Sequence, residues 1–243
     1  MAKIRLDQEL LNRQLVETKS KAQSLILLGK VKVNQQSIFK AGFFVPPHAT
    51  IEIEEEFLYV SRGALKLLKA FEEFSLNAQN KIAIDIGSST GGFTQVLLEK
   101  GASKVYAVDS GTNQLHYKLR THPKVEVLEQ TNARYLTKAQ FNPLPLLAVI
   151  DVSFISLSLI LPVVKNLECA EVVALIKPQF EVGKEIKNFD GVVKTQEDRD
   201  KAIEKVKNYA IQNNFKVKGV VESPITGPKG NQEYLIYLSF ILP

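Results

Sequence analysis

Five short apolar runs, separated by helix-like segments, are the feature that most constrains the fold of this chain. Each run is almost continuously apolar and has the length of a strand buried on both faces of a parallel sheet. The runs are KIAIDIG (81–87), KVYAVD (104–109), KVEVLE (124–129), LLAVID (146–151) and VVALIKP (172–178). Strands of this kind need helices on both faces of their sheet, so the runs favour an α/β architecture.

The segments around these runs complete the pattern. Helices are predicted for TGGFTQVLLEK, QLHYKLR, SLSLILPVVKNL and EDRDKAIEKVKNYAIQNN, and two closing strands for FKVKGVVES and EYLIYLSFIL. This alternation predicts a doubly wound α/β domain. Ligands of such domains bind at the carboxyl ends of the parallel strands, so functional residues are expected there.

A glycine-rich loop, DIGSSTGGF (85–93), follows the first run. It lacks the GK[ST] of a P-loop, and its glycine spacing differs from the G-x-G-x-x-G of dinucleotide-binding folds. Asp85 would repel a pyrophosphate, whereas the ammonium and sulfonium groups of S-adenosylmethionine suit an acidic neighbour. Asp109 ends the next run, where a carboxylate can accept hydrogen bonds from ribose hydroxyls. S-adenosylmethionine is therefore the predicted cofactor; the simpler alternative is that both aspartates only cap loops.

Further residues complete the predicted cofactor site. Asn132 and Ala133, after the third run, are placed to meet the adenine. Phe93 and Phe154 could pack on the cofactor, although a phenylalanine more often belongs to the core. The predicted cofactor-binding residues are Asp85, Gly87, Ser88, Ser89, Thr90, Gly91, Gly92, Phe93, Asp109, Asn132, Ala133, Asp151 and Phe154.

Four charged residues are expected to converge at the same edge of the sheet. Asp151 ends the fourth run and Lys177 ends the fifth, while Glu233 begins the last strand, which reaches this edge if it runs antiparallel. Lys66 lies on a predicted helix, SRGALKLLKAFEEF, that could reach over the cleft. Charges that meet in a cleft are costly to bury unless they pair, so a functional cluster is predicted. Ordinary surface charges at strand ends are the alternative.

The net charge of +5 is concentrated in residues 1–48. This segment contains eight basic and three acidic residues, and the remainder contains 23 of each sign. A compact basic module favours a polyanionic partner, with chance asymmetry of a solvated surface as the alternative. RLDQELLNRQL and TKSKAQSLILLGK predict two short helices, the second capped by Thr18 or Ser20 and ended by Gly29. VKVNQQSI and IEIEEE predict strands.

The patterns RLD-x-x-L, TKSKA and LI-x-x-G-x-V-x-VN in this segment resemble the S-four-type RNA-binding module, also called the alpha-L motif. The resemblance implies that basic side chains on the two helices contact an RNA backbone. The matching candidates are Arg5, Arg13, Lys19 and Lys21. Such contacts give salt-dependent affinity and little sequence choice. The sequence departs from the module at Gln35, where a glycine usually follows VN.

A second resemblance extends over nearly the whole chain. YVSRGALKL, DIGSSTGGFTQVLL, NQLHYKLR, EQTNARYL, DVSFISLSLILP, LIKPQFEVGK and SPITGPKGNQEY together resemble the hemolysin A (TlyA-type) rRNA methyltransferases, which are relatives of the FtsJ/RrmJ-type 2′-O-methyltransferases. The resemblance implies a Rossmann-like class I methyltransferase fold, with a seven-stranded sheet whose last strand is antiparallel. It also implies methyl transfer from S-adenosylmethionine to the ribose 2′-hydroxyl of a cytidine in small-subunit rRNA, large-subunit rRNA or both. The complete N-terminal module favours action on both.

The same resemblance implies a catalytic Lys-Asp-Lys-Glu tetrad. Matched motif by motif, it falls on Lys66, Asp151, Lys177 and Glu233, without a departure. Lys177 is expected to touch the 2′-oxygen, as a base or as an electrostatic stabiliser. Asp151 is expected to reach the sulfonium end of the cofactor, and Arg62 is a candidate phosphate contact.

These motifs predict three parts of the chain: an alpha-L RNA-binding domain at 1–56, a linker at 57–60 and a methyltransferase domain at 61–243. No secretory signal or membrane-spanning run is evident, and three scattered histidines with one cysteine give no metal-ligand spacing. A cytoplasmic protein that acts on rRNA or ribosomal subunits, without metal or membrane, is therefore expected.

Other functions are less consistent with the sequence. Amino-methylation of a base uses an Asn/Asp-Pro-Pro-aromatic loop, but the loop at Asp151 reads DVSF. Carbon-5 methylation of cytosine needs a nucleophilic cysteine, and Cys169 precedes the fifth run, away from the predicted cleft. Two alternatives of other classes are a non-catalytic RNA-binding or ribosome-assembly factor and a membrane-active hemolysin. The tetrad argues against the first, and no lytic amphipathic segment supports the second.

Overall fold

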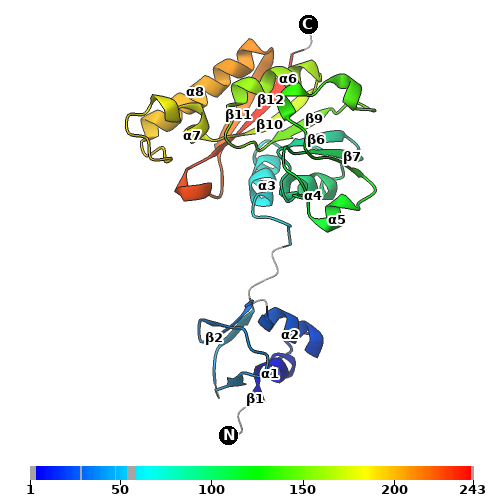
Figure 1. Ribbon diagram of the computed structural model, residues 1–243, viewed down its shortest axis with the longest axis vertical. Helices are drawn as coiled ribbons and strands as arrows, with labels where there is room; N and C mark the ends of the chain where they lie inside the picture. The colour runs from blue at the N-terminus through cyan, green and yellow to red at the C-terminus, as the bar shows by residue number, and fades with distance from the viewer. Residues whose placement is uncertain (1–3, 28, 47, 54–57, 242–243) are drawn as a thin grey trace. The chain divides into compact units, whose positions relative to one another are not determined.

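The chain forms two compact units, Met1–Leu58 and Tyr59–Pro243, in a computed structural model (Figure 1). The structure describes residues 4–27, 29–46, 48–53 and 58–241. Residues 54–57, which hold the end of the predicted strand IEIEEE and the first residue of the predicted linker, lie outside this described part.

The small unit contains two helices and two small antiparallel sheets. Apolar side chains from both helices and from strands β2 and β4 share one core. The sheets have the strand orders β3-β2-β5 and β1-β4. The elements are β1 (Ile4–Arg5), α1 (Leu6–Asn12), α2 (Lys19–Leu27), β2 (Val31–Val33), β3 (Gln36–Ile38), β4 (Phe44–Val45) and β5 (Ile51–Ile53).

Local signals in the small unit act as the sequence predicts. The Thr18 hydroxyl accepts a hydrogen bond from the Lys21 N–H at 3.2 Å and so caps α2. Gly29 follows the helix with a φ of +70°. The turn between β2 and β3 places Asn34 and Gln35 at φ +49° and +67°. Gln35 therefore adopts the left-handed conformation that glycine usually supplies in such a hairpin.

The large unit is built on a seven-stranded sheet with the order β11-β12-β10-β9-β6-β7-β8. Strands β6 to β10 are parallel, whereas β12 lies between β10 and β11 and is antiparallel to both. This confirms the predicted fold class. The strands are β6 (Ile82–Ile86), β7 (Lys104–Val108), β8 (Val125–Leu128), β9 (Leu147–Ile150), β10 (Glu171–Ile176), β11 (Phe215–Glu222) and β12 (Tyr234–Phe240).

Helices cover both faces of this sheet (Figure 1). Ala83 of β6 belongs to an apolar cluster with α3 and α4, and the next residue, Ile84, belongs to a cluster with α6 and α8. Alternate strand residues therefore enter opposite layers, as expected for a doubly wound domain. The helices are α3 (Ala64–Glu73), α4 (Gly92–Glu99), α5 (Tyr117–Arg120), α6 (Leu161–Asn166), α7 (Pro178–Glu181) and α8 (Gln196–Gln212).

Two predicted helices are shorter than the sequence suggests. SLSLILPVVKNL begins with a 3-10 turn at Leu157–Leu159, and α6 starts only at Leu161. Pro162 has no N–H and fits the first turn of a helix, so the α-helix starts there. QLHYKLR is helical over α5 alone.

Candidate active site

A cavity of about 1030 Å³ lies at the carboxyl ends of the parallel strands of the large unit. Seven of the predicted cofactor-binding residues line it: Gly87, Ser89, Asp109, Asn132, Ala133, Asp151 and Phe154. The other six do not: Asp85, Ser88, Thr90, Gly91, Gly92 and Phe93. The cavity therefore extends along one side of the glycine-rich loop, past the ends of β6, β7, β8 and β9.

The loop can approach β9 because Gly87 has no side chain. A Cβ atom at Gly87 would lie 2.5 Å from the backbone oxygen of Asp151, and its φ of +87° is also unfavourable for other residues. Gly92 meets the start of α3 in the same way, with Ser61 Oγ 2.3 Å from the position of a Cβ. Both glycines allow close packing of the loop against other segments, and Gly87 also lines the cavity.

Two predicted cofactor contacts are buried inside the protein instead. Asp85 is fully buried beneath the loop, where its carboxylate accepts a hydrogen bond from the Thr94 hydroxyl at 2.6 Å. Its other oxygen has no hydrogen-bond partner among the described residues, and burial raises the pKa of Asp85 to about 7. Phe93 packs in the core between α3, α4 and the sheet. Neither side chain lines the cavity, so neither is placed to contact a ligand bound there.

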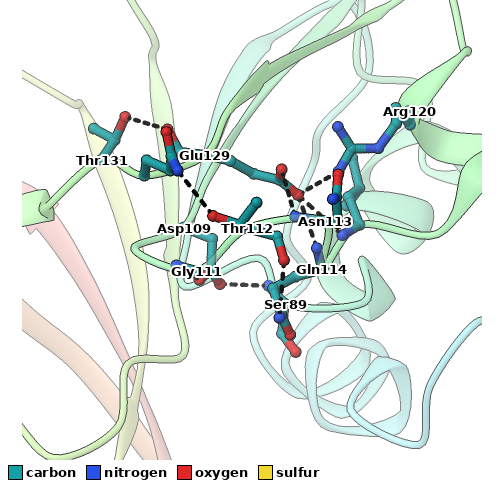
Figure 2. A network of polar contacts seen from close by, with 11 residues as sticks. Ser89, Asp109, Gly111, Thr112, Asn113, Gln114, Arg120, Glu129 and Thr131 are labelled. Atoms are coloured by element: carbon teal, nitrogen blue, oxygen red, sulfur yellow. Dashed lines mark hydrogen bonds and ion pairs between the residues drawn. The ribbon is translucent and has the colours of Figure 1, made fainter.

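Asp109 binds the backbone of two neighbouring loops (Figure 2). One carboxylate oxygen accepts a hydrogen bond from the Ser89 N–H at 2.8 Å, and the other accepts one from the Gly111 N–H at 2.7 Å. Each carboxylate oxygen has a further lone pair that can accept a ligand hydroxyl. Asp109 thus fixes the backbone of the cavity wall and can still accept a hydrogen bond from a ligand in the cavity.

Glu129 was missed by the sequence reading and organises the next loop (Figure 2). Its carboxylate accepts the backbone N–H groups of Asn113, Gln114 and Leu115 at 2.8–3.3 Å and pairs with the Arg120 guanidinium. Burial alone would raise the pKa of Glu129, but these donors outweigh it and hold the pKa below its ordinary value. The only sequence signal was an acid at the end of a predicted strand.

The four predicted tetrad side chains converge in one continuous chain of ion pairs. Lys66 Nζ lies 2.6 Å from Glu233 Oε2 and 3.8 Å from Asp151 Oδ2. Asp151 Oδ1 lies 2.6 Å from Lys177 Nζ, which also donates to the Ser153 hydroxyl at 2.8 Å. Glu233 is fully buried, and the two lysines are less than a tenth exposed. Positive and negative groups alternate, which offsets the cost of burying them.

The loop before β12 packs its backbone against Glu233 at Gly227. A Cβ atom at Gly227 would lie 2.1 Å from Glu233 Oε1, and no group in the described part of the chain forms a hydrogen bond with this oxygen. The buried Asn231 side chain donates to the Gly191 carbonyl and accepts the Val193 N–H, so it joins the segment before β12 to the segment before α8. Neither Gly227 nor Asn231 was identified from the sequence.

Phe154 stands at the rim of the cavity. Its side chain is 91% exposed, its φ is +63°, and its ring centroid lies 5.2 Å from that of Phe180. Glu181 supports the same loop by accepting the Ser156 hydroxyl and the Leu157 N–H. The positive φ directs an exposed aromatic ring next to Ser153, the partner of the catalytic candidate Lys177.

Two of the predicted RNA-binding arginines make internal contacts in the small unit. Arg5 forms two hydrogen bonds with the buried Asp7 and holds the pKa of that carboxyl well below its usual range. Arg13 pairs with Glu9 and donates to the Ala49 carbonyl. Both arginines therefore also serve the fold. The remaining three candidates, Lys19, Lys21 and Arg62, are exposed.

Several features bear on the functions considered above. Cys169 is buried, and burial raises the pKa of its thiol to about 12, which does not suit a nucleophile. Within the described ranges, no cluster of His, Cys, Asp or Glu side chains could hold a metal ion. None of the helices in the same ranges is both long and apolar enough to span a bilayer.

Comparisons with known proteins agree with this geometry. Residues 59–240 match the model of the FtsJ-like methyltransferase family, and residues 4–51 match the S4 domain. The putative rRNA methyltransferase YqxC of Bacillus subtilis is 44% identical over 97% of this chain and 85% of its own length. The 16S/23S rRNA (cytidine-2′-O)-methyltransferase TlyA of Mycobacterium tuberculosis is 40% identical over 96% of this chain and 89% of its own length. A solved structure of a putative hemolysin from Streptococcus thermophilus matches with a TM-score of 0.75 and 44% identity, over 99% of this chain and 89% of that one.

Proposed function

The chain belongs to the FtsJ-like family, as a TlyA-type rRNA methyltransferase with an S4 domain, and on this premise we propose its reaction. It transfers a methyl group from S-adenosylmethionine to the ribose 2′-hydroxyl of a cytidine in ribosomal RNA. The observation that carries this proposal is the chain of ion pairs that runs from Glu233 through Lys66 and Asp151 to Lys177. Of these four residues, Asp151 lines the cavity.

The side chains at the cavity suit S-adenosylmethionine. Asp109 and Asp151 place two carboxylates on its wall, where the backbone of Gly87 also lies. Asp109 would accept hydrogen bonds from the ribose hydroxyls, and Asn132 and Ala133 would border the adenine. Asp151 would face the positively charged end of S-adenosylmethionine. When bound, S-adenosylmethionine supplies an activated methyl group on a sulfonium.

Lys177 is the residue that we assign to the acceptor oxygen. A ribose hydroxyl is a weak nucleophile, so it must be oriented and its proton must be removed in the transition state. Asp151 and Ser153 fix Lys177 Nζ, which can contact the 2′-oxygen as a base or stabilise its developing negative charge. Lys66 and Glu233 act behind this pair, because their contacts hold the second oxygen of Asp151 in place.

The small unit supplies the second half of the proposal. Exposed Lys19 and Lys21, with Arg62 on the large unit, would contact RNA phosphates and give affinity that falls with salt. The S4 match over residues 4–51 supports action on both small-subunit and large-subunit rRNA. A non-catalytic RNA-binding factor would have no use for two lysines and two carboxylates that pair in one cluster, with Asp151 on the cavity wall.

Methyl transfer to ribosomal subunits tests the proposal. Purified protein is incubated with labelled S-adenosylmethionine and small or large subunits from cells that lack this gene. We expect label in the rRNA, at a nucleotide whose 3′ linkage resists alkaline hydrolysis because its 2′-oxygen is methylated. No transfer to either subunit would falsify the proposed activity. Transfer to a nucleotide that alkali still cleaves would place the methyl group on a base.

A further inference from the structure

Tyr135 is an exposed aromatic residue beside the cavity that the proposed reaction leaves without a role. It ends the 3-10 turn Ala133–Tyr135, and its side chain is 71% exposed. The two residues before it, Ala133 and Arg134, line the cavity, whereas Tyr135 does not. The next residue, Leu136, is 5% exposed and anchors the turn in the core. The ring is therefore presented outside the mouth of the cavity on a short, anchored segment.

The turn that carries Tyr135 is internally braced. The Asn132 side chain accepts hydrogen bonds from the Arg134 N–H at 3.1 Å and from Arg134 Nε at 3.3 Å. The Tyr135 N–H donates to the Asn132 carbonyl at 3.0 Å. The Arg134 guanidinium lies 5.4 Å from the centroid of the Tyr135 ring, within the range of a cation–π contact. The ring and the cation thus form a pre-organised pair.

The charge of Arg134 indicates which kind of partner would cover the exposed ring of Tyr135. Among the described residues, no carboxylate forms an ion pair with the Arg134 guanidinium. An apolar protein partner that covered Tyr135 would also take this cation out of water without a counter-charge, which is costly. A single-stranded nucleic acid brings a flat base for the ring and phosphates for the cation, so it satisfies both groups at once.

We propose that Tyr135 stacks on the base of an unpaired nucleotide of the bound RNA. This inference rests on the function proposed above and extends it to a second recognition element. Because Tyr135 lies outside the cavity, the stacked base is not the adenine of S-adenosylmethionine. The contact is tolerant of base identity, since every base offers a π-face, and it contributes affinity rather than chemistry.

Substitution of the ring separates stacking from charge. Tyr135→Ala is expected to raise the Kd for ribosomal subunits about 5- to 150-fold, the range measured when stacking aromatics are removed. Tyr135→Phe should bind like the wild type. The slope of log Kd against log salt should not change, because no phosphate contact is lost. The matched control is Tyr117→Ala, which removes a comparably exposed tyrosine, 74% exposed, from α5.

A fluorescence experiment tests the stacking directly. The chain has no tryptophan, so Tyr135→Trp introduces a single emitter. Stacking on a base should quench its emission when protein-free 16S or 23S rRNA is added, whereas the emission of Tyr117→Trp should stay constant. Unchanged emission from Tyr135→Trp, at rRNA concentrations that saturate binding in a filter assay, overturns the proposal.

The outcomes also separate this inference from the function on which it rests. If the wild type binds subunits but Tyr135→Ala binds them equally well, only the stacking role is wrong. If Tyr135→Ala weakens binding of S-adenosylmethionine and leaves the subunit Kd unchanged, Tyr135 covers the cofactor and the proposal is likewise overturned. If the wild type neither binds nor methylates either subunit, the proposed function fails and the inference fails with it.

Discussion

Two lysines on one helix of the large unit show how position decides what a charged residue does. Lys66 and Lys69 both lie on α3, and each pairs with a glutamate. Lys66 is buried and reaches Glu233 and Asp151, whereas Lys69 is about a third exposed and pairs with Glu73 one helical turn away. The buried pair spans 167 residues of sequence and joins α3 to the last strand.

Lys66→Ala should therefore reduce both activity and stability. Loss of the lysine leaves Glu233 buried without its partner, so the free energy of unfolding should fall by about 3–5 kcal/mol. Loss of the support for Asp151 should lower kcat/KM for methyl transfer by about 100-fold or more. Denaturant titration and initial rates measure the two effects. Lys69→Ala is the control: its free energy of unfolding should fall by less than about 1 kcal/mol, and its rate of methyl transfer should be that of the wild type. Equal effects of the two substitutions would contradict the role assigned to Lys66.

Asp85 gives a pH dependence whose sign follows from its burial. Its pKa is raised to about 7 in the folded protein, whereas an unfolded aspartate titrates near pH 4. Between these values the folded state binds more protons, so stability should fall by up to about 1.4 kcal/mol per unit as pH rises. Asp85→Asn should remove this slope between pH 4 and 7 in denaturant titrations. A slope that persists unchanged in the variant would assign the effect to another group.

The candidate residues could be located from the sequence to different degrees. Asp109, Asp151 and Lys177 follow apolar runs, and parallel strands end at one edge of a sheet, so their approximate places follow from periodicity alone. Asp85 lies in β6 and Phe93 in the first turn of α4, and the direction of each side chain decides whether it faces the cavity or the core. That direction depends on the packing of Gly87 and Gly92 against other segments, which no local pattern encodes.

At the scale of elements, the loop after β7 depends on a residue from the neighbouring strand. Glu129, just after β8, binds three consecutive backbone N–H groups of residues 113–115 (Figure 2). The strand positions were predictable, because buried strands have a distinctive apolar pattern. The contact was not, because it requires the loop to fold back over a strand that follows it in sequence. Only the strand order β6-β7-β8 brings the two together.

Glu129→Ala should loosen this loop and weaken cofactor binding. Three N–H groups and Arg120 lose their acceptor, so the wall that contains Asp109 and Gly111 should lose its order. We expect the Kd for S-adenosylmethionine to rise about tenfold or more by calorimetry. The control is Glu126→Ala on β8, whose carboxylate is 45% exposed and pairs with Lys104. A wild-type Kd in the Glu129 variant would show that the loop holds its shape without this carboxylate.

At the scale of the whole molecule, each unit has a core of its own. The apolar cluster of the small unit contains residues from 6 to 53 only, and the clusters of the large unit contain residues from 59 onward. The boundary between basic and neutral charge in the sequence falls near the same place. Composition could therefore predict that two modules exist, whereas the placement of Arg5 and Arg13 in internal contacts could not be predicted from charge counts.

A fragment of residues 59–243 should fold and bind S-adenosylmethionine with the wild-type Kd, because the cavity is built from the large unit alone. Its affinity for ribosomal subunits should fall, and its salt slope should be smaller, because the phosphate contacts of the small unit are lost. Adding the small unit as a separate chain should restore little of this affinity, because only the covalent link keeps the small unit at a high effective concentration near the RNA bound by the large unit. If the fragment bound ribosomal subunits with the wild-type Kd, the small unit would have no role in RNA binding.

The position of β12 also affects when the protein becomes active during its own synthesis. Glu233 is translated 167 residues after Lys66, and β12 must insert between β10 and β11, which are already made. Until that insertion, Lys66 lacks its main partner and the sheet has a gap next to Lys177. A chain synthesised only as far as β11 therefore contains the residues of the cofactor cavity without a complete tetrad. The insertion of β12 is thus the folding step that completes the cluster of charged residues.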